Sequence, residues 1–189
     1  MKSYKFFVAL AFFCASTFAH AVPKQISKEQ ADQLASEYAK EKFIKTSSPT
    51  QFFLNEVQEC PTQDLKSCVK VVCDKTKDCV FDSNLKEIAQ ACRGASGDCV
   101  DVLCSKTNDC FFKSSALALV ESCKASNGAC TRIGCEKTGD CAFSSNAKEI
   151  AKACMGVYDD QCVSFACERS GSCVFKSSFI AIARSCAGY

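Results

Sequence analysis

Hydrophobic and polar residues follow the same order four times between Cys68 and Cys186. Each copy opens with a short segment in which apolar and polar residues alternate, such as Cys-Val-Lys-Val-Val-Cys at 68–73. A polar segment, a second short apolar segment and a run with apolar residues three and four positions apart complete the copy. Alternation is typical of a strand with one buried face, and the longer spacing is typical of an amphipathic helix. The pattern therefore predicts a strand, a turn, a second strand and a helix.

The polar segment of each copy predicts a hairpin turn between two cysteines. Its fourth position favours residues that tolerate positive φ. In the four copies this position is Lys77, Asn108, Gly139 and Gly171. The second strand is expected to place an aromatic ring on the same face as its cysteine, inside the core. These aromatic residues are Phe81, Phe112, Phe143 and Phe175.

The last segment of each copy predicts a helix that carries the fourth cysteine on its buried face. In the first copy Ile88 and Cys92 share that face. Asn84 and Glu87 have the spacing of a capping box at the start of the helix, and copy three repeats this pair.

A second period lies inside the first. Copies one and three share Ser-Asn-x-Lys-Glu-Ile-Ala-x-Ala-Cys, whereas copies two and four share Phe-Lys-Ser-Ser. The duplicated unit is therefore a pair of copies. The even helices carry Leu117 and Ile180 where the odd helices are charged, and we expect this face to be covered by another repeat of the chain or by a partner.

The segment before the repeats predicts helices. Ser27 and Gln30 have the spacing of a capping box that starts an amphipathic helix ending near Lys45. Pro49 interrupts the pattern, and a second helix over 50–59 leads to Cys60. This cysteine takes the place of the fourth cysteine in a partial repeat at the end of the array.

These elements predict an α+β fold class: tandem small disulfide-stapled hairpin-plus-helix (ββα) repeats preceded by an N-terminal helical segment. The chain divides into a signal peptide, an N-terminal helical segment with a partial cap repeat, and four cysteine repeats, with bounds 1–21, 22–60, 61–92, 93–123, 124–154 and 155–189.

The beginning of the chain predicts export. Lys2 and Lys5 precede an apolar run over 6–13, and Ala-His-Ala at 19–21 is typical of a signal-peptidase site before Val22. The run is too short to span a bilayer, and no membrane span is expected. We predict a secreted protein of the extracellular space or a bacterial periplasm. The expected mature chain keeps 17 of the 18 cysteines, which in an exported protein indicates a disulfide framework.

Charge and motif content exclude several classes of function. Removal of residues 1–21 takes away the only histidine and leaves 21 basic and 21 acidic side chains. Nucleic acid is not an expected partner, because phosphate binding needs a basic surplus. The C-x4-C-x5-C-x12-C frame lacks the close pairs of structural zinc sites and the C-x-x-C of redox sites, so we expect no metal and no cofactor.

No catalytic residues are expected. The mature chain has no histidine base, no G-x-S-x-G and no H-E-x-x-H. The carboxylate pair Asp159-Asp160 lies in an inter-repeat loop with one extra residue, where a solvated turn explains it. We predict that the protein is not an enzyme.

The cysteine pairing has two solutions. Bridges across the turns would join Cys73–Cys79, Cys104–Cys110, Cys135–Cys141 and Cys167–Cys173. In a strand the first cysteine lies about 16 Å from the second, beyond the roughly 7 Å limit for bridged Cα atoms, so it pairs with a helix-end cysteine. Pairing between neighbouring repeats is favoured, because a short loop joins the partners; it gives Cys60–Cys68, Cys92–Cys99, Cys123–Cys130 and Cys154–Cys162, with Cys186 unpaired. Pairing within repeats, as in Cys68–Cys92, is the alternative, and spacing alone does not decide.

We predict an exported cysteine-rich repeat protein that acts as a disulfide-stabilised scaffold for binding another protein or extracellular macromolecule. The candidate binding residues are the basic residue of each turn and the apolar residues of the even helices: Lys75, Lys106, Lys137, Arg169, Leu117 and Ile180. The alternative is an inhibitor that inserts a disulfide-closed loop, such as 135–141, into the active site of an extracellular hydrolase. A homodimer through Cys186 or the even-helix faces is a further option, and a small secreted enzyme using carboxylates is the third function considered.

Overall fold

The structure is a computed structural model that describes residues 25–45 and 62–187. Its regular elements in these ranges are α-helices and three short 3-10 helices. Their bounds are α1 Lys28–Lys45, α2 Thr62–Thr76, η1 Asp78–Val80, α3 Asp82–Ala91, α4 Gly97–Thr107, η2 Asp109–Phe111, α5 Lys113–Ser122, α6 Gly128–Thr138, η3 Asp140–Ala142, α7 Ser144–Ala153, α8 Asp160–Ser170 and α9 Lys176–Cys186.

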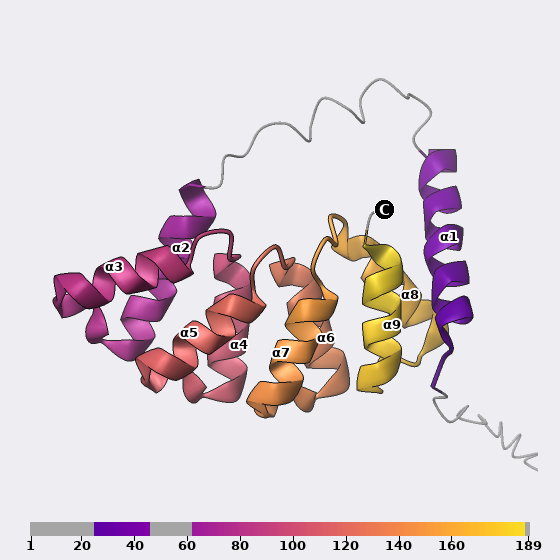
Figure 1. Cartoon of the computed structure of the whole chain (residues 1–189). Coiled ribbons are helices and arrows are strands. Elements are labelled where there is room, and N and C mark those ends of the chain that lie inside the picture. Colours follow the sequence, from indigo (N-terminus) through magenta and orange to yellow (C-terminus); the bar gives the residue numbers. More distant parts are fainter. Residues whose placement is uncertain (1–24, 46–61, 188–189) are drawn as a thin grey trace, which may run out of the picture.

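Each repeat is a pair of antiparallel helices, and the four pairs stack side by side (Figure 1). The first helices α2, α4, α6 and α8 form one layer, and the second helices α3, α5, α7 and α9 form the other. The turns inside the repeats follow the lower edge of the array in Figure 1, and the loops between repeats follow the upper edge. The core lies between the layers and consists of cysteines and aliphatic side chains from every repeat, together with the ring of Phe179. This is the architecture of a helical repeat array, in which each unit buries its apolar face against its neighbours.

The α+β prediction is wrong. The described residues contain no strand, only isolated backbone bridges between the inter-repeat loops. The alternating stretch 68–73 lies inside α2, where the buried residues are Cys68, Val72 and Thr76. A spacing of four is helical, and an alternation over six residues is too short to separate a strand from a buried helix.

Helices α4, α6 and α8 begin with caps that explain why these segments are helical. Ser96, Asn127 and Asp159 each lie three residues before the first cysteine of their repeat. Their side-chain oxygens accept backbone N–H groups of the first helical turn at 2.9–3.4 Å. Such caps satisfy amides that have no partner within the helix, which stabilises the helix start by about 1 kcal/mol.

The prediction of positive φ at the fourth turn position is confirmed, with φ of 60°, 56°, 70° and 62° at Lys77, Asn108, Gly139 and Gly171. These residues end the first helix of each repeat instead of turning a hairpin. The preceding threonine fixes the stop. In repeat 2, the Thr107 hydroxyl donates to the Leu103 carbonyl at 2.9 Å and accepts the Asp109 N–H at 3.1 Å, and repeats 1 and 3 have the same pair of bonds.

Eight disulfides join the described cysteines, two in each repeat. The predicted bridges across the turns are confirmed as Cys73–Cys79, Cys104–Cys110, Cys135–Cys141 and Cys167–Cys173. The favoured pairing between neighbouring repeats is wrong, and so is the prediction of an unpaired Cys186. The second set of bridges lies within the repeats: Cys68–Cys92, Cys99–Cys123, Cys130–Cys154 and Cys162–Cys186.

The helical rise explains this pairing. A helix advances 1.5 Å per residue, less than half the advance of a strand, so the first cysteine stays near the level at which the returning second helix ends. The bridged Cα atoms are therefore only 5.6–5.9 Å apart. Cys60, for which a partner was predicted, lies outside the described residues.

The loops between repeats are joined by backbone hydrogen bonds. The Ala125 N–H donates to the Gly94 carbonyl at 2.8 Å, and the Gly156 N–H donates to the Ala125 carbonyl at 3.1 Å. Below the loops the first helices approach closely, since a Cβ on Gly97 would lie 2.3 Å from Ser67 Oγ of α2. Successive repeats are thus held in register by the backbone as well as by the core.

Helix α1 covers the end of the array that repeat 4 would otherwise leave open (Figure 1). The predicted capping box at its start is confirmed: the Ser27 N–H donates to Gln30 Oε1 at 2.9 Å, and the Gln30 N–H donates to Ser27 Oγ at 3.3 Å. Helix α1 extends to Lys45, where the described range ends, so the predicted end of the helix near this residue stays a prediction. Ser185 of α9 donates to Asp32 Oδ1 at 2.6 Å, which fixes α1 against the last repeat. The helix predicted over 50–59 lies outside the described residues.

The pairwise period of the sequence has a structural cause. Lys113 at the start of α5 donates to Asn84 Oδ1 at 2.9 Å and pairs with Glu87 at 2.6 Å, both on α3. Lys176 of α9 makes the same contacts with Asn146 and Glu149 of α7. The capping boxes predicted at Asn84 and Asn146 are wrong. The helices begin two residues before these asparagines, at Asp82 and Ser144, and the asparagine side chains bind the lysine of the next repeat.

Candidate functional site

The turns inside the repeats expose a row of large apolar side chains, which we call the aromatic edge. It consists of Val80, Phe81, Phe111, Phe112, Phe143, Val174 and Phe175. The phenylalanines predicted to fill the core, one in each repeat, are 39–74 % exposed, so that prediction is wrong. Exposed apolar side chains that recur in every repeat along one edge form a surface of the kind that marks interaction sites in soluble proteins.

The same four phenylalanines occupy the N-cap positions of the second helices. Phe81, Phe112, Phe143 and Phe175 have extended φ and ψ, and none makes a side-chain cap hydrogen bond. Serine, threonine, aspartate or asparagine at an N-cap stabilises a helix by about 1 kcal/mol relative to a residue that cannot accept a hydrogen bond. The chain therefore carries, at four equivalent places, a residue that neither caps its helix nor fills the core.

The charges beside the aromatic edge cancel. Residues 74–82 and 136–144 each have one more acidic than basic side chain, and residues 105–113 and 168–176 each have one more basic than acidic side chain. The edge is therefore apolar and neutral, with charged groups of both signs around it.

The basic residues predicted as a recognition ridge lie at the same edge. Lys75, Lys106, Lys137 and Arg169 belong to the last turns of α2, α4, α6 and α8. A positive charge at a helix C-terminus is stabilised by the helix dipole, by about 0.3–1 kcal/mol at an exposed position. This local role explains why a basic residue recurs there.

The other predicted binding residues lie apart from this edge. Leu117 and Ile180 are half-buried on α5 and α9 and pack against the core of their own chain. Cys186 is fully buried and bonded to Cys162. Of the carboxylate pair Asp159-Asp160, Asp159 has a structural function, because it caps α8 and also accepts a hydrogen bond from the Tyr38 hydroxyl.

Two further features bear on chemistry. Within the described ranges, no three of the histidine, cysteine, aspartate and glutamate side chains are grouped so that they could hold a metal ion. No helix in those ranges combines the length and the apolar composition needed to cross a bilayer. The predicted signal peptide, residues 1–21, lies outside the described residues.

The sequence contained a signal for the aromatic edge that the strand interpretation concealed. In a strand the aromatic residue two positions past a cysteine shares its face, whereas at the start of a helix it becomes the N-cap and points away from the core. The positive φ four positions earlier and the Lys-Thr-x-Asp stop in three of the repeats place it there.

Comparisons of this chain with models of protein families, with curated proteins and with solved structures found no match.

Proposed function

We propose that this chain is an exported, disulfide-stapled helical scaffold, without catalytic activity, that binds a partner protein through the aromatic edge. Eight disulfides in four similar helix pairs fit an oxidising environment and a rigid array. Little ordering entropy is lost when such a surface binds, because its backbone is already fixed.

The observation that carries the proposal is the exposed phenylalanine at the N-cap of every second helix. A serine there would stabilise the helix, and the ring contributes little to the core at an exposure of 39–74 %. Residues that reduce stability at equivalent exposed places are typical of functional surfaces, where activity is favoured over stability. Aromatic side chains are also the residues that contribute most to protein–protein binding.

The charge balance favours a protein over other macromolecules. Nucleic acids and anionic membranes are bound through an excess of lysine and arginine. The four turn segments carry as many acidic as basic side chains. A neutral apolar surface with charged residues around it resembles the centre and rim of a protein interface.

The inhibitor alternative lacks its main structural element in the described residues. The segment closed by Cys135–Cys141 is helical up to Thr138 and enters a 3-10 helix at Asp140. No extended loop is therefore present between these cysteines for insertion into an active site.

Replacement of Phe81, Phe112, Phe143 and Phe175 by serine tests the proposal. We expect this variant to unfold in denaturant at the same or a higher concentration than the unchanged protein, since each serine can cap its helix. We expect it to lose the partner that the unchanged protein retains in co-purification from the secreted or periplasmic fraction. A photo-crosslinking phenylalanine analogue at position 112 should attach to the same partner.

A matched control replaces Met155 and Tyr158 by serine. These residues are 46 % and 80 % exposed in the loop between α7 and α8, on the opposite edge of the array. The control should retain the partner. If the phenylalanine variant kept the partner, or if it unfolded much more easily than the unchanged protein, the aromatic edge would have a structural function and the proposal would be wrong.

A further inference from the structure

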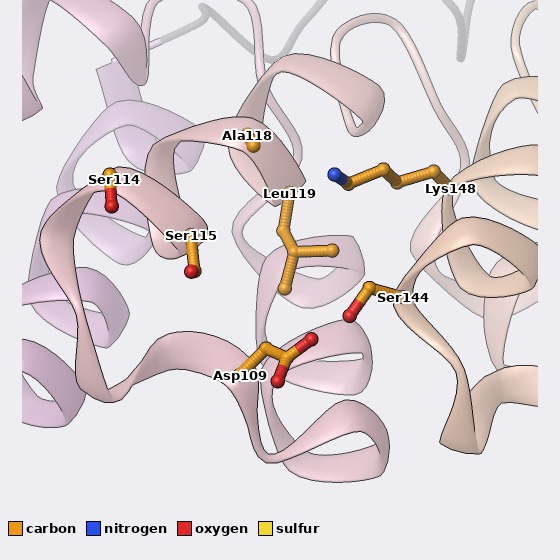
Figure 2. Close-up of a pocket in the computed structure, with 7 residues that line it drawn as sticks. All are labelled: Asp109, Ser114, Ser115, Ala118, Leu119, Ser144 and Lys148. Atoms are coloured by element: carbon orange, nitrogen blue, oxygen red, sulfur yellow. The ribbon is translucent and has the colours of Figure 1, made fainter.

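A pocket of about 230 Å³ lies between α5 and α7, at the junction of repeats 2 and 3. The residues that line it are Asp109, Ser114, Ser115, Ala118, Leu119, Ser144 and Lys148 (Figure 2). The pocket is smaller than the roughly 300–1,000 Å³ of sites that hold whole small molecules, and it suits one or two side chains of a peptide.

The pocket exists because this junction lacks the contact of a lysine with an asparagine and a glutamate that the other two junctions make. At the junctions of repeats 1 and 2 and of repeats 3 and 4, a lysine from the later repeat donates to an asparagine and forms an ion pair with a glutamate of the earlier repeat. At the junction of repeats 2 and 3 the three corresponding residues are Ser144, Ser115 and Ala118. Their short side chains leave the space open.

The helix positions that line the pocket already hold a peptide segment elsewhere in the chain. The serines at 114–115 of α5 correspond to the serines at 177–178 of α9. On α9 the backbone N–H of Ile26 donates to Ser178 Oγ at 3.1 Å, and the side-chain amide of Gln25 donates to Ser177 Oγ. Ile26 is half-buried and packs against the core. The segment belongs to no regular element, since α1 begins only at Lys28.

We propose that the α5–α7 pocket binds an extended segment of a partner protein with the same chemistry, a side-chain amide followed by a β-branched aliphatic residue. The backbone N–H of the aliphatic residue donates to Ser115, and its side chain lies against the exposed Ala118. The side-chain amide donates to Ser114. Lys148 extends from α7 toward α5 (Figure 2), where its ammonium can donate to a carbonyl oxygen of the segment.

This proposal rests on the proposed function in one respect: it takes the segment that occupies the pocket from a protein partner. Asp109 is the first residue of η2, and Ser144 follows Phe143, so the pocket adjoins the aromatic edge in the sequence. A partner that covers the edge could therefore place one segment in the pocket. The pocket can be tested with a peptide, without the partner.

The probe is a synthetic peptide of residues 24–30, acetylated and amidated at its ends, added to the isotope-labelled full chain. Nuclear magnetic resonance would follow the backbone amides. We expect shifts at Ser115, Leu119 and Ser144 that saturate with a dissociation constant on the order of 1 mM, because a short flexible peptide loses much entropy on binding. A peptide with glycine at the isoleucine position should cause no shifts there.

Two variants test whether the peptide binds in the α5–α7 pocket. The triple change Ser115→Asn, Ala118→Glu and Ser144→Lys rebuilds the lysine contact of the other junctions, so it should fold and fill the pocket. Binding should weaken by about tenfold or more. Ser115→Ala removes only the acceptor of the backbone N–H and should weaken binding by about threefold to tenfold. Equal melting temperatures of the variants and the unchanged protein would exclude unfolding as the cause.

Three outcomes would overturn the proposal. Shifts confined to residues 177–178 would mean that the peptide only replaces the chain's own segment on α9. Unchanged affinity in the triple variant would place the peptide elsewhere. A concentration-dependent dimer that disappears in the triple variant would identify the occupant as the same segment of a second copy. Each of these results leaves the test of the aromatic edge by phenylalanine replacement unaffected.

Discussion

The ring of Phe179 in α9 fills the space that a side chain at Gly134 of α6 would occupy. A Cβ on Gly134 would lie 2.5 Å from two ring carbons of Phe179 and 2.6 Å from a methyl carbon of Ile150. The corresponding pairs at the two earlier junctions are Val72 with Ala116 and Leu103 with Ala147. At the two earlier junctions the larger residue of the pair lies on the first helix, and at the junction of repeats 3 and 4 it lies on the second helix. The large and the small residue have exchanged places, so the total core volume is kept.

Gly134→Ala should therefore destabilise the protein although alanine favours helices. The gain in helix propensity is about 1 kcal/mol, and the overpacking against Phe179 costs about 1–3 kcal/mol. Denaturant unfolding without reductant measures the difference. Combining Gly134→Ala with Phe179→Leu should recover part of the loss, because the smaller side chain makes room. Stabilisation by Gly134→Ala alone would contradict the close contact.

The sequence predicted the parts of the fold that are specified locally. The start of α1, the second helices and the positive φ of the turns follow from capping residues, apolar spacing and residues that tolerate that backbone. The capping box of Ser27 and Gln30 is the clearest case, because both bonds lie within four residues.

The first helices could not be recognised from their alternation alone. The stretch 68–73 fits both the strand period and the helix period, and the Lys-Thr-x-Asp stop after it favours the helix. The strand interpretation then carried two further errors. It favoured a bridge from Cys68 to the preceding repeat over a bridge to Cys92, and it turned Phe81 inward. The contacts of Lys113 with α3 depend on how repeats stack, which no spacing within one repeat contains.

Removal of the two kinds of disulfide should have unequal effects. Each bridge between helices closes a separation of 24 residues, and each turn bridge closes a separation of 6. The chain-entropy estimate gives about 3 kcal/mol for the former and about 2 kcal/mol for the latter. Replacing Cys130 and Cys154 by alanine should therefore lower the free energy of unfolding more than replacing Cys135 and Cys141. Calorimetry on the two double variants makes the comparison.

The pairing itself can be checked by peptide mapping without reductant. The expected product near the C-terminus joins Cys162 with Cys186. A product that joins Cys154 with Cys162 would show that bridges link neighbouring repeats and would contradict the structure.

Ala125→Gly should stabilise the protein. Ala125 has φ of 52°, and the corresponding residues of the other two loops are Gly94 and Gly156, with φ of 74° and 73°. The left-handed conformation costs a residue with a Cβ about 1–2 kcal/mol, of which part is offset by the greater freedom of glycine in the unfolded chain. We expect a net gain of about 0.5–1 kcal/mol. Ala118→Gly, at an exposed position inside α5, is the control and should lose about the same amount.

The contact between α1 and the last repeat should weaken in alkali. Burial raises the pKa of the Tyr38 hydroxyl, and the hydrogen bond to the Asp159 carboxylate raises it further. The ring also lies against Phe165, with centroids 5.7 Å apart. The folded state thus favours the neutral phenol, whose ordinary pKa is about 10. The stabilisation is complete below that pH and is lost as the pH rises above it, because the unfolded chain then releases the proton more readily than the folded one.

Urea unfolding at pH 7.5 and at pH 10.5, without free thiol, measures this loss. The unchanged protein and the control Tyr158→Phe, whose ring is 80 % exposed, should lose stability between the two pH values. Tyr38→Phe should lose less, since it has no proton to release at this position. At pH 7.5 Tyr38→Phe should be the less stable of the two variants, because Asp159 loses the hydroxyl that donates to it. If all three proteins lost stability equally between the two pH values, Tyr38 would not titrate with folding, and the hydrogen bond between α1 and Asp159 would not hold α1 in place.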